Sequence, residues 1–142
     1  MRFAGPVWRR TLVECVATPA GAPEGRFHHS GQFAIYASLS AEGAMVAVQR
    51  YLGDGNERSV LPLWFDAQRV ADQRGNAEAS VVWQDFRERG ALAPTWAFSD
   101  AARRRGAQAM LYSSRSRPDL AHVVVFEPDC LRATGAAQPF KP

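Results

Sequence analysis

Segments with the side-chain alternation of β-strands lie near both ends of the chain, and segments with helical periodicity are inserted irregularly between them. A regular strand–helix repeat would favour a doubly wound α/β sheet, whereas this irregular order favours an α+β fold. At 142 residues the chain has the size of one domain, so we expect a single domain over residues 1–142. The predicted strands are 6–13, 33–38, 60–65, 109–113 and 122–126, and the predicted helices are 41–52, 77–89 and 96–105.

Single residues mark where several of these elements begin and end. Ser40 is a suitable N-cap for the first helix, and Glu42 puts a negative charge at the positive start of that helix. Gly90 and Gly106 follow the other two helices, where glycine commonly adopts the left-handed conformation that ends a helix. Pro62 cannot donate a ladder hydrogen bond, so the third strand is expected at an edge or a bulge.

Composition excludes several classes of protein. A hydrophobic share of 46% with a charged share of 22% is typical of a globular chain and not of a disordered one. The sequence has no apolar run long enough to cross a membrane and no apolar core of a signal peptide near residue 1, so we expect a cytoplasmic protein. Two cysteines, Cys15 and Cys130, imply no disulfide framework and are expected to pack as small hydrophobic side chains.

The basic residues are almost all arginine. Of 17 basic residues, every one except Lys141 is an arginine. Arginine offers a planar fork that binds phosphate or carboxylate in a bidentate manner, but a GC-rich genome would give the same bias through codon usage. Most of the arginines are scattered, which disfavours a nucleic-acid binder with one basic face. The run 103–105 falls in the last turn of a predicted helix, where we expect solvated cations that complement the helix dipole.

Common metal and nucleotide motifs are missing from the sequence. It contains no glycine-rich phosphate loop, no HExxH and no CxxC pair. His28 and His29 are adjacent, and adjacent side chains of an extended segment point in opposite directions, so we do not expect them to share a metal.

A set of short segments, in a fixed order, resembles one family. The closing strand 122–126 and the segments 94–97 and 100–103, with Gly106, belong to the same pattern. The main segments are Val7-Trp8-Arg9, Gly25-Arg26-Phe27, Ile35 to Ser40 with Met45 to Arg50, and Leu111 to Pro118. Together these segments resemble the RES domain, the toxin half of bacterial Xre/RES toxin–antitoxin pairs, and the resemblance extends over roughly residues 7–126.

The resemblance implies an ADP-ribosyltransferase-like fold with twisted β-sheets and flanking helices around a cleft for NAD+. Members of the family break the bond between nicotinamide and ribose, either destroying NAD+ or transferring ADP-ribose to a protein, so the resemblance implies NAD+ as substrate and no metal. The implied partner is a helical, Xre-type antitoxin that covers the toxin's site and itself binds DNA, so direct contact with nucleic acid is not expected. A homodimer is left open, as is the acceptor of ADP-ribose, which is water, phosphate or a protein.

Four residues of the pattern suit the chemistry of NAD+. A pyrophosphate calls for guanidinium forks, which Arg9 and Arg26 could supply, although both could equally be surface arginines. Tyr36 matches the family's tyrosine that faces the cationic nicotinamide ring, and its alternative is a core tyrosine of a strand. Ser114 matches the family's serine, which would bond the ribose or position Tyr36, and its alternative is a serine that caps its own turn.

The main departure from the family lies at Ala47. The resemblance places a glutamate eleven residues after Tyr36, where it would stabilise the positive charge of an oxocarbenium-like transition state. Glu42 is not a good substitute, because five residues along a helix correspond to about 140° of rotation. Two explanations remain: a natural, inactive relative that binds its partner without catalysis, or a deliberate glutamate-to-alanine substitution, which we favour. Loss of such a contact commonly costs about 10²–10³ in rate, so the chain is expected to be a poor enzyme.

Further departures concern the segment before Tyr36 and the last strand. Glu24 and the segment 28–30 differ from the family's usual residues, which leaves the shape of the predicted phosphate loop open. His122 stands where the family frequently has asparagine, and the sequence assigns it no role.

Overall fold

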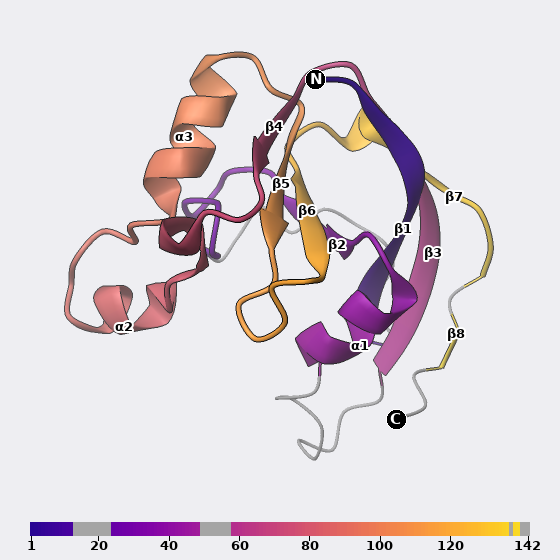
Figure 1. Ribbon diagram of the computed structural model, residues 1–142, viewed down its shortest axis with the longest axis horizontal. Coiled ribbons are helices and arrows are strands. Elements are labelled where there is room, and N and C mark those ends of the chain that lie inside the picture. The colour runs from indigo at the N-terminus through magenta and orange to yellow at the C-terminus, as the bar shows by residue number, and fades with distance from the viewer. Residues whose placement is uncertain (13–23, 49–57, 137, 140–142) are drawn as a thin grey trace.

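One mixed β-sheet forms the frame of the molecule, and helices cover parts of it (Figure 1). The computed structural model describes residues 1–12, 24–48, 58–136 and 138–139. The strand order is β4-β5-β6-β2-β1-β3-β7, β8 pairs with β3, and β4 and β5 form the parallel pair among antiparallel neighbours. The predicted α+β class is confirmed. The strands are β1 (Phe3–Leu12), β2 (Ile35–Ser38), β3 (Arg58–Ala67), β4 (Val70–Gln73), β5 (Ala109–Ser113), β6 (Ala121–Val125), β7 (Leu131–Ala133) and β8 (Gln138–Pro139).

The helices are short, and the structure divides one predicted helix in two. They are α1 (Ala41–Val48), α2 (Trp83–Glu88) and α3 (Trp96–Arg104), with the 3-10 helices η2 (Ala77–Ser80) and η3 (Pro128–Cys130). The single helix predicted over 77–89 is therefore wrong, because Val81 and Val82 separate η2 from α2 and Val82 has extended backbone angles. The predicted end of the first helix, 49–52, lies outside the described residues.

The boundary signals in the sequence are confirmed where the structure describes them. The amide of Gly43 donates to the Ser40 hydroxyl at 3.0 Å, which is the expected cap of α1. Gly90 and Gly106 both adopt positive φ angles after α2 and α3. The expectation of an edge strand or a bulge at Pro62 is wrong, because β3 has β1 on one side and β7 and β8 on the other, with an unbroken register against β1. Pro62 is tolerated because it falls at the gap between β7 and β8, where its missing N–H costs no ladder bond.

A narrow seam joins the two halves of the sheet. β1 pairs with β3 along its whole length, from Phe3 opposite Ala67 to Leu12 opposite Arg58. Between β1 and β2 the register has a single residue pair, Trp8 opposite Ser38. Since strands twist relative to their neighbours, a junction this short lets the two halves diverge on either side of it.

Two hydrophobic clusters lie on opposite faces of the central strands. Alternate residues of β6 show this most clearly, because Val123 and Val125 belong to one cluster and Val124 to the other. The first cluster also contains Val7, Phe65 and Cys130 of the strands and η3, and the second is covered by α3 and η2. A strand that is buried on both faces reads as a continuous apolar run, as Val123 to Val125 of β6 do.

Two expectations about cysteines and membranes can be compared with the described residues. Cys130 is a buried free thiol and packs as a small hydrophobic side chain, and its pKa is raised by burial. Cys15 lies outside the described residues. Among the helices that the structure describes, none has both the length and the apolar character needed to cross a bilayer.

Replacing Leu111 by alanine is expected to lower the free energy of unfolding by about 2–5 kcal/mol, because truncating a fully buried side chain leaves a cavity. Urea denaturation followed by circular dichroism measures the change. Leu92→Ala is the control, since that side chain is 74% exposed and should change stability by no more than about 0.5 kcal/mol. Equal losses in both variants would contradict the placement of Leu111 in the core.

Candidate functional site

A cleft of about 650 Å³ opens beside the seam between β1 and β2. The rest of its walls come from the loop before β2, β2 itself, α1, the segment 81–84 at the start of α2, the strands β5 and β6 and the turn after β5. Aromatic rings and hydroxyl groups dominate the lining, with two guanidinium groups among them. The described lining residues are Trp8, Gly25, Arg26, Tyr36, Ala37, Ser38, Ala44, Val46, Val81, Val82, Trp83, Gln84, Tyr112, Ser114, Arg115, Ser116 and His122.

The structure brings three of the predicted site residues to this cleft. Arg26, Tyr36 and Ser114 come from the loop before β2, from β2 and from the end of β5, and all three line it. Arg9 is next to Trp8 on β1, and successive side chains of a strand point to opposite faces. Since Trp8 lines the cleft, Arg9 lies on the other face, and its proposed contact with phosphate stays a prediction.

Arg26 is fixed by hydrogen bonds that leave part of its guanidinium available. Its Nε and Nη2 donate to the carbonyl of Ala79 at 3.2 and 2.8 Å, and a guanidinium carries five N–H donors in total. The group also lies over the ring of Tyr112, with its central carbon 4.9 Å from the ring centroid. Burial lowers the pKa of Arg26 and the nearby charge of Arg115 lowers it further, but arginine remains charged in proteins.

Tyr36 presents its ring to the cleft and anchors its hydroxyl in the protein. The hydroxyl accepts a hydrogen bond from the amide of Phe27 at 2.8 Å and lies 2.8 Å from Nδ1 of His28. Burial raises the pKa of Tyr36 well above its usual value, so the phenol is neutral at physiological pH. The residue therefore offers an uncharged aromatic surface in a fixed position.

Gly25 is required by the packing of His28. A Cβ at Gly25 would come within 2.3 Å of the His28 ring and 3.0 Å of the Tyr36 hydroxyl. The absence of a side chain therefore lets His28 reach Tyr36. The space that a side chain at position 25 would take is filled by the protein's own histidine.

Ser114 combines a place in the cleft with a turn-forming role. Its hydroxyl accepts a hydrogen bond from the amide of Arg117 at 3.3 Å, and its amide donates to the carbonyl of Leu120 at 2.9 Å. The turn that follows β5 is thus closed by this residue, as one interpretation of the sequence predicted. Ser114 is buried and still lines the cleft, so both roles are compatible.

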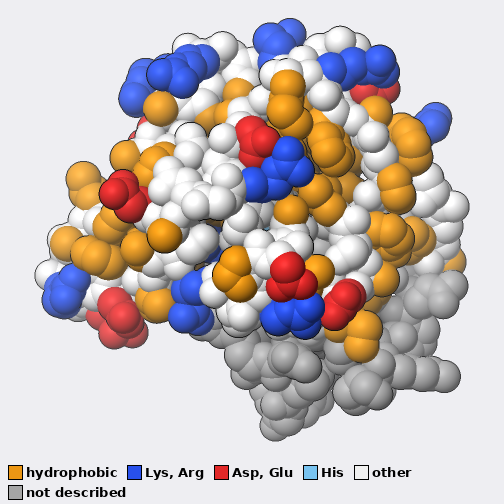
Figure 2. Space-filling view, viewed as in Figure 1, with side chains coloured by type: hydrophobic (Ala, Val, Ile, Leu, Met, Phe, Trp, Pro, Cys, Tyr) orange, Lys and Arg blue, Asp and Glu red, His pale blue; other side chains and the backbone are white. Residues whose placement is uncertain are grey.

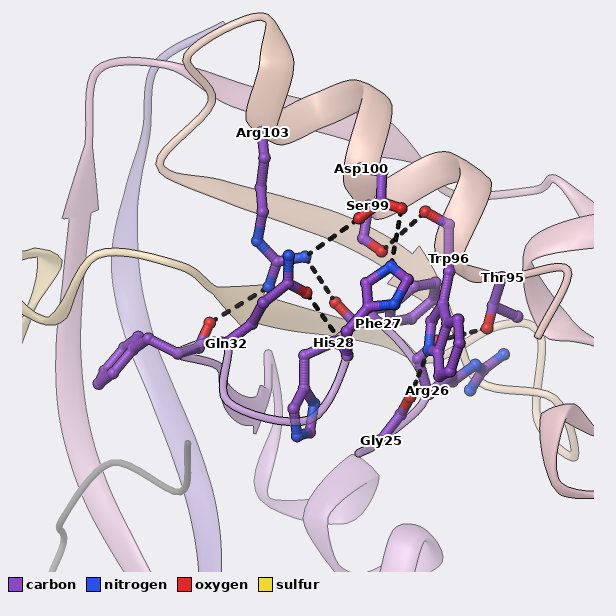
Figure 3. A network of polar contacts seen from close by, with 12 residues as sticks. Gly25, Arg26, Phe27, His28, Gln32, Thr95, Trp96, Ser99, Asp100 and Arg103 are labelled. Atoms are coloured by element: carbon purple, nitrogen blue, oxygen red, sulfur yellow. Dashed lines mark hydrogen bonds and ion pairs between the residues drawn. The ribbon is translucent and has the colours of Figure 1, made fainter. Parts of the chain in front are cut away.

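Helix α3 holds the loop that carries Arg26, as Figure 3 shows. The Thr95 hydroxyl, at the start of the helix, donates to the backbone carbonyl of Arg26. The indole Nε1 of Trp96 donates to the carbonyl of Gly25 at 2.8 Å. Thr95 is fully buried and Trp96 nearly so, so these bonds satisfy loop carbonyls that water cannot reach.

Arg103 extends this support to the far end of the loop (Figure 3). Its Nη1 donates to the carbonyl of Phe27 at 3.0 Å and its Nη2 to that of Phe33 at 3.2 Å. The predicted solvated helix end is therefore wrong for Arg103, because its side chain turns inward to two backbone acceptors. The prediction holds for Arg104 and Arg105, which are exposed.

The two adjacent histidines point to different partners. His28 lies against Tyr36, whereas Nε2 of His29 is 2.8 Å from a carboxylate oxygen of Asp100 and its ring stacks on Trp96 with centroids 4.2 Å apart. This is the divergence expected of neighbours in an extended segment. Within the described residues no cluster of three or more histidine, cysteine or acidic side chains has metal-binding geometry.

Position 47 lies on the helix that forms one wall of the cleft. The backbone of Ala47 belongs to α1, its side chain is outside the described part, and Ala44 and Val46 of the same helix line the cleft. The carboxylate of Glu42 is exposed and lies 3.3 Å from a guanidinium nitrogen of Arg117. Glu42 is not among the described lining residues, which is evidence against its use as a substitute acid.

The structure adds residues that the sequence did not single out. Arg115 lines the cleft and, within the part of the chain that is described, pairs with no carboxylate. Tyr112 and Ser114 occupy alternate positions at the end of β5, so strand alternation could have placed Tyr112 beside Ser114. For Trp8 the signal was weaker, since only its pairing with Ser38 across the seam brings it to the cleft.

On one face of the molecule the basic side chains are dispersed. Figure 2 shows Lys and Arg side chains in separate small groups on one face, several of them beside acidic side chains. Arg74 pairs with Asp72 and Arg117 pairs with Asp119, each with a nitrogen–oxygen distance of 2.7 Å. The face shown in Figure 2 therefore carries no continuous basic surface.

Comparison with known proteins identifies the family. The model of the RES domain matches residues 4–141, so the chain belongs to the RES domain family. Among solved structures, the protein is similar to a chain in the crystal structure of the M. tuberculosis MbcT–MbcA toxin–antitoxin complex, with a TM-score of 0.74 and 18% sequence identity. That similarity covers 99% of this chain and 86% of the other, and it establishes a shared fold. A comparison with curated proteins gives no match.

Thr95→Val should lower the free energy of unfolding by about 1–3 kcal/mol, because valine keeps the shape of the side chain but leaves the buried carbonyl of Arg26 without its donor. Thr95→Ser restores a hydroxyl and serves as the matched control. Urea unfolding curves of the three proteins measure the effect. A valine variant as stable as the serine variant would show that the bond contributes nothing to holding the loop.

Proposed function

We propose that this RES-family protein is built to cleave the nicotinamide–ribose bond of NAD+, and that the reaction requires an acidic residue at position 47. The observation that supports the proposal most is that Arg26, Tyr36 and Arg115 line the same cleft. These residues supply the two kinds of group that a dinucleotide with a cationic ring demands, which are guanidinium donors and an aromatic face.

The pyrophosphate would bind to the guanidinium groups of the cleft. Arg26 is preorganised by its bonds to Ala79, and Arg115 is close enough for its charge to act on Arg26. Two like charges held near each other repel in the free protein, and an anion between them relieves that repulsion. The support of the Arg26 backbone by Thr95 keeps the first guanidinium in place before the ligand arrives.

The nicotinamide ring would lie against Tyr36. A neutral phenol ring attracts a pyridinium cation through its quadrupole, and this attraction disappears once the bond breaks and nicotinamide leaves uncharged. The hydrogen bond from Phe27 to the hydroxyl prevents the ring from turning away. Ser114, on the neighbouring part of the lining, would bond a ribose hydroxyl.

Bond cleavage moves positive charge from the pyridinium to the ribose. A carboxylate on α1 would stabilise that charge, since the helix forms one wall of the cleft. With alanine at position 47 this contribution is missing. The present chain should therefore bind the dinucleotide but cleave it slowly.

The biological role that fits this chemistry is that of a toxin controlled by an antitoxin. The similar chain of known structure comes from a toxin–antitoxin complex, and the RES resemblance implies an Xre-type antitoxin as partner. In this proposal the antitoxin covers the cleft, and the target is the NAD+ pool of the cytoplasm. A homodimer is compatible with the proposal and not required by it.

A second candidate function is suggested by Ala47 itself. A RES-fold protein without the acid would bind NAD+ or an antitoxin and catalyse nothing. The two candidates differ in whether an acid at position 47 produces turnover.

Ala47→Glu is expected to raise the rate of nicotinamide release from NAD+ by about 10²–10³, because it supplies the missing carboxylate. Ala47→Gln is the control, since it has the same size and no charge. Chromatography of the released nicotinamide gives the rates. If the glutamate variant released no more nicotinamide than buffer, the enzymatic proposal would be wrong and the binding role would stand.

Arg115→Ala should weaken the binding of ADP-ribose by about 10-fold or more, which is the usual effect of removing one charge-assisted hydrogen bond. Isothermal titration calorimetry on the chain with Ala47 measures this without turnover. Arg132→Ala removes an exposed arginine of β7 that is not among the described lining residues, and should leave the affinity unchanged. Equal affinities for both variants would exclude Arg115 from the binding site.

A further inference from the structure

Ser38 and His122 form a hydrogen-bonded pair on the wall of the cleft. They stand directly opposite each other on the antiparallel strands β2 and β6. Ser38 Oγ is 2.7 Å from His122 Nδ1, and both residues line the cleft although both are buried, with 4% and 7% of their surface exposed.

The pair lies between Tyr36, where the nicotinamide would bind, and α1, which would carry the acid at position 47. Tyr36 and Ser38 are two residues apart on β2, so their side chains share the cleft face about 7 Å apart. On its other side, Ser38 packs closely against α1, because a Cβ at Gly43 would come within 3.2 Å of the Ser38 Cβ. If the nicotinamide binds at Tyr36, the ribose attached to it and facing α1 therefore lies beside Ser38.

Among the described lining residues of the cleft, His122 carries the side chain that can accept a proton. Arg26 and Arg115 are cations that do not lose their protons, and the phenols of Tyr36 and Tyr112 are already protonated. An imidazole changes its charge near neutral pH. His28 bonds the Tyr36 hydroxyl and is not among the described lining residues.

Cleavage of NAD+ creates a demand for such an acceptor when the nucleophile is neutral. The C–N bond breaks with its electron pair going to nicotinamide, which leaves uncharged. Water then forms the new C–O bond to the ribose and must lose one proton. An anion such as azide attacks the same carbon with no proton to lose.

We propose that Ser38 and His122 together accept this proton and make water the acceptor of ADP-ribose. The Ser38 hydroxyl takes the proton from the attacking water and passes its own to Nδ1 of His122, which ends as imidazolium. The products are ADP-ribose and nicotinamide, with the released proton held on His122. This inference rests on the proposed function and names the acceptor that the function left open.

The test uses the Ala47→Glu protein as parent and compares it with a His122→Asn variant. Asparagine can keep a hydrogen bond to Ser38 but cannot take up a proton. ADP-ribose formation should fall by about 10² or more, the usual contribution of a general base, with little change in KM. In the presence of sodium azide the variant should form ADP-ribosyl azide at a rate close to the parent's. Chromatography separates the two products.

Ser38→Ala serves as a second variant that leaves the histidine in place. It should show the same selective loss with water and the same recovery with azide. Equal loss with both nucleophiles, or hydrolysis by either variant at the parent's rate, would overturn the inference. So would ADP-ribose 1-phosphate as the main product of the parent in phosphate buffer. A parent that releases no nicotinamide would instead overturn the proposed function itself, and the inference with it.

Discussion

The backbone carbonyls of residues 25–33 need donors, and α3 supplies them. Thr95, Trp96 and Arg103 donate hydrogen bonds to carbonyls at both ends of this loop, which lies about seventy residues before them in the chain. Each donor is buried or half-buried, so loss of one leaves an acceptor that water reaches poorly. The loop in turn supplies Arg26 to the cleft and the amide that fixes Tyr36. The arrangement of the cleft therefore depends on a helix that lies outside it.

The seam between β1 and β2 explains why the cleft lies where it does. A fully paired sheet would have closed this region, whereas one residue pair leaves room beside it for side chains from both halves. Trp8 and Ser38, the residues of that pair, are both lining residues. The narrow junction thus brings β1 and β2 together while exposing one face of each to a ligand-sized space.

The sequence predicted most of the regular elements and part of the site, and its errors have physical causes. Alternation and caps located β5, α3 and the start of α1, because these signals are local. Strand β4 was missed because four residues with two polar side chains become a strand only by pairing with β5. Arg103 was placed in solvent because nothing near it in the chain reveals the loop carbonyls it bonds. His122 was given no role, since its partner Ser38 lies far away in sequence and becomes its neighbour through β2–β6 pairing.

The cations that the structure places on the cleft wall are guanidinium groups, with no lysine among the lining residues described. A guanidinium keeps its charge at every pH that a living cell tolerates. Its attraction for an anion is therefore weakened by dissolved salt and unaffected by acidity. The proton of the proposed hydrolysis passes instead to His122, a group separate from these cations. Retention of a ligand and transfer of a proton are thus assigned to separate groups, and a change of medium can alter one while leaving the other as it was.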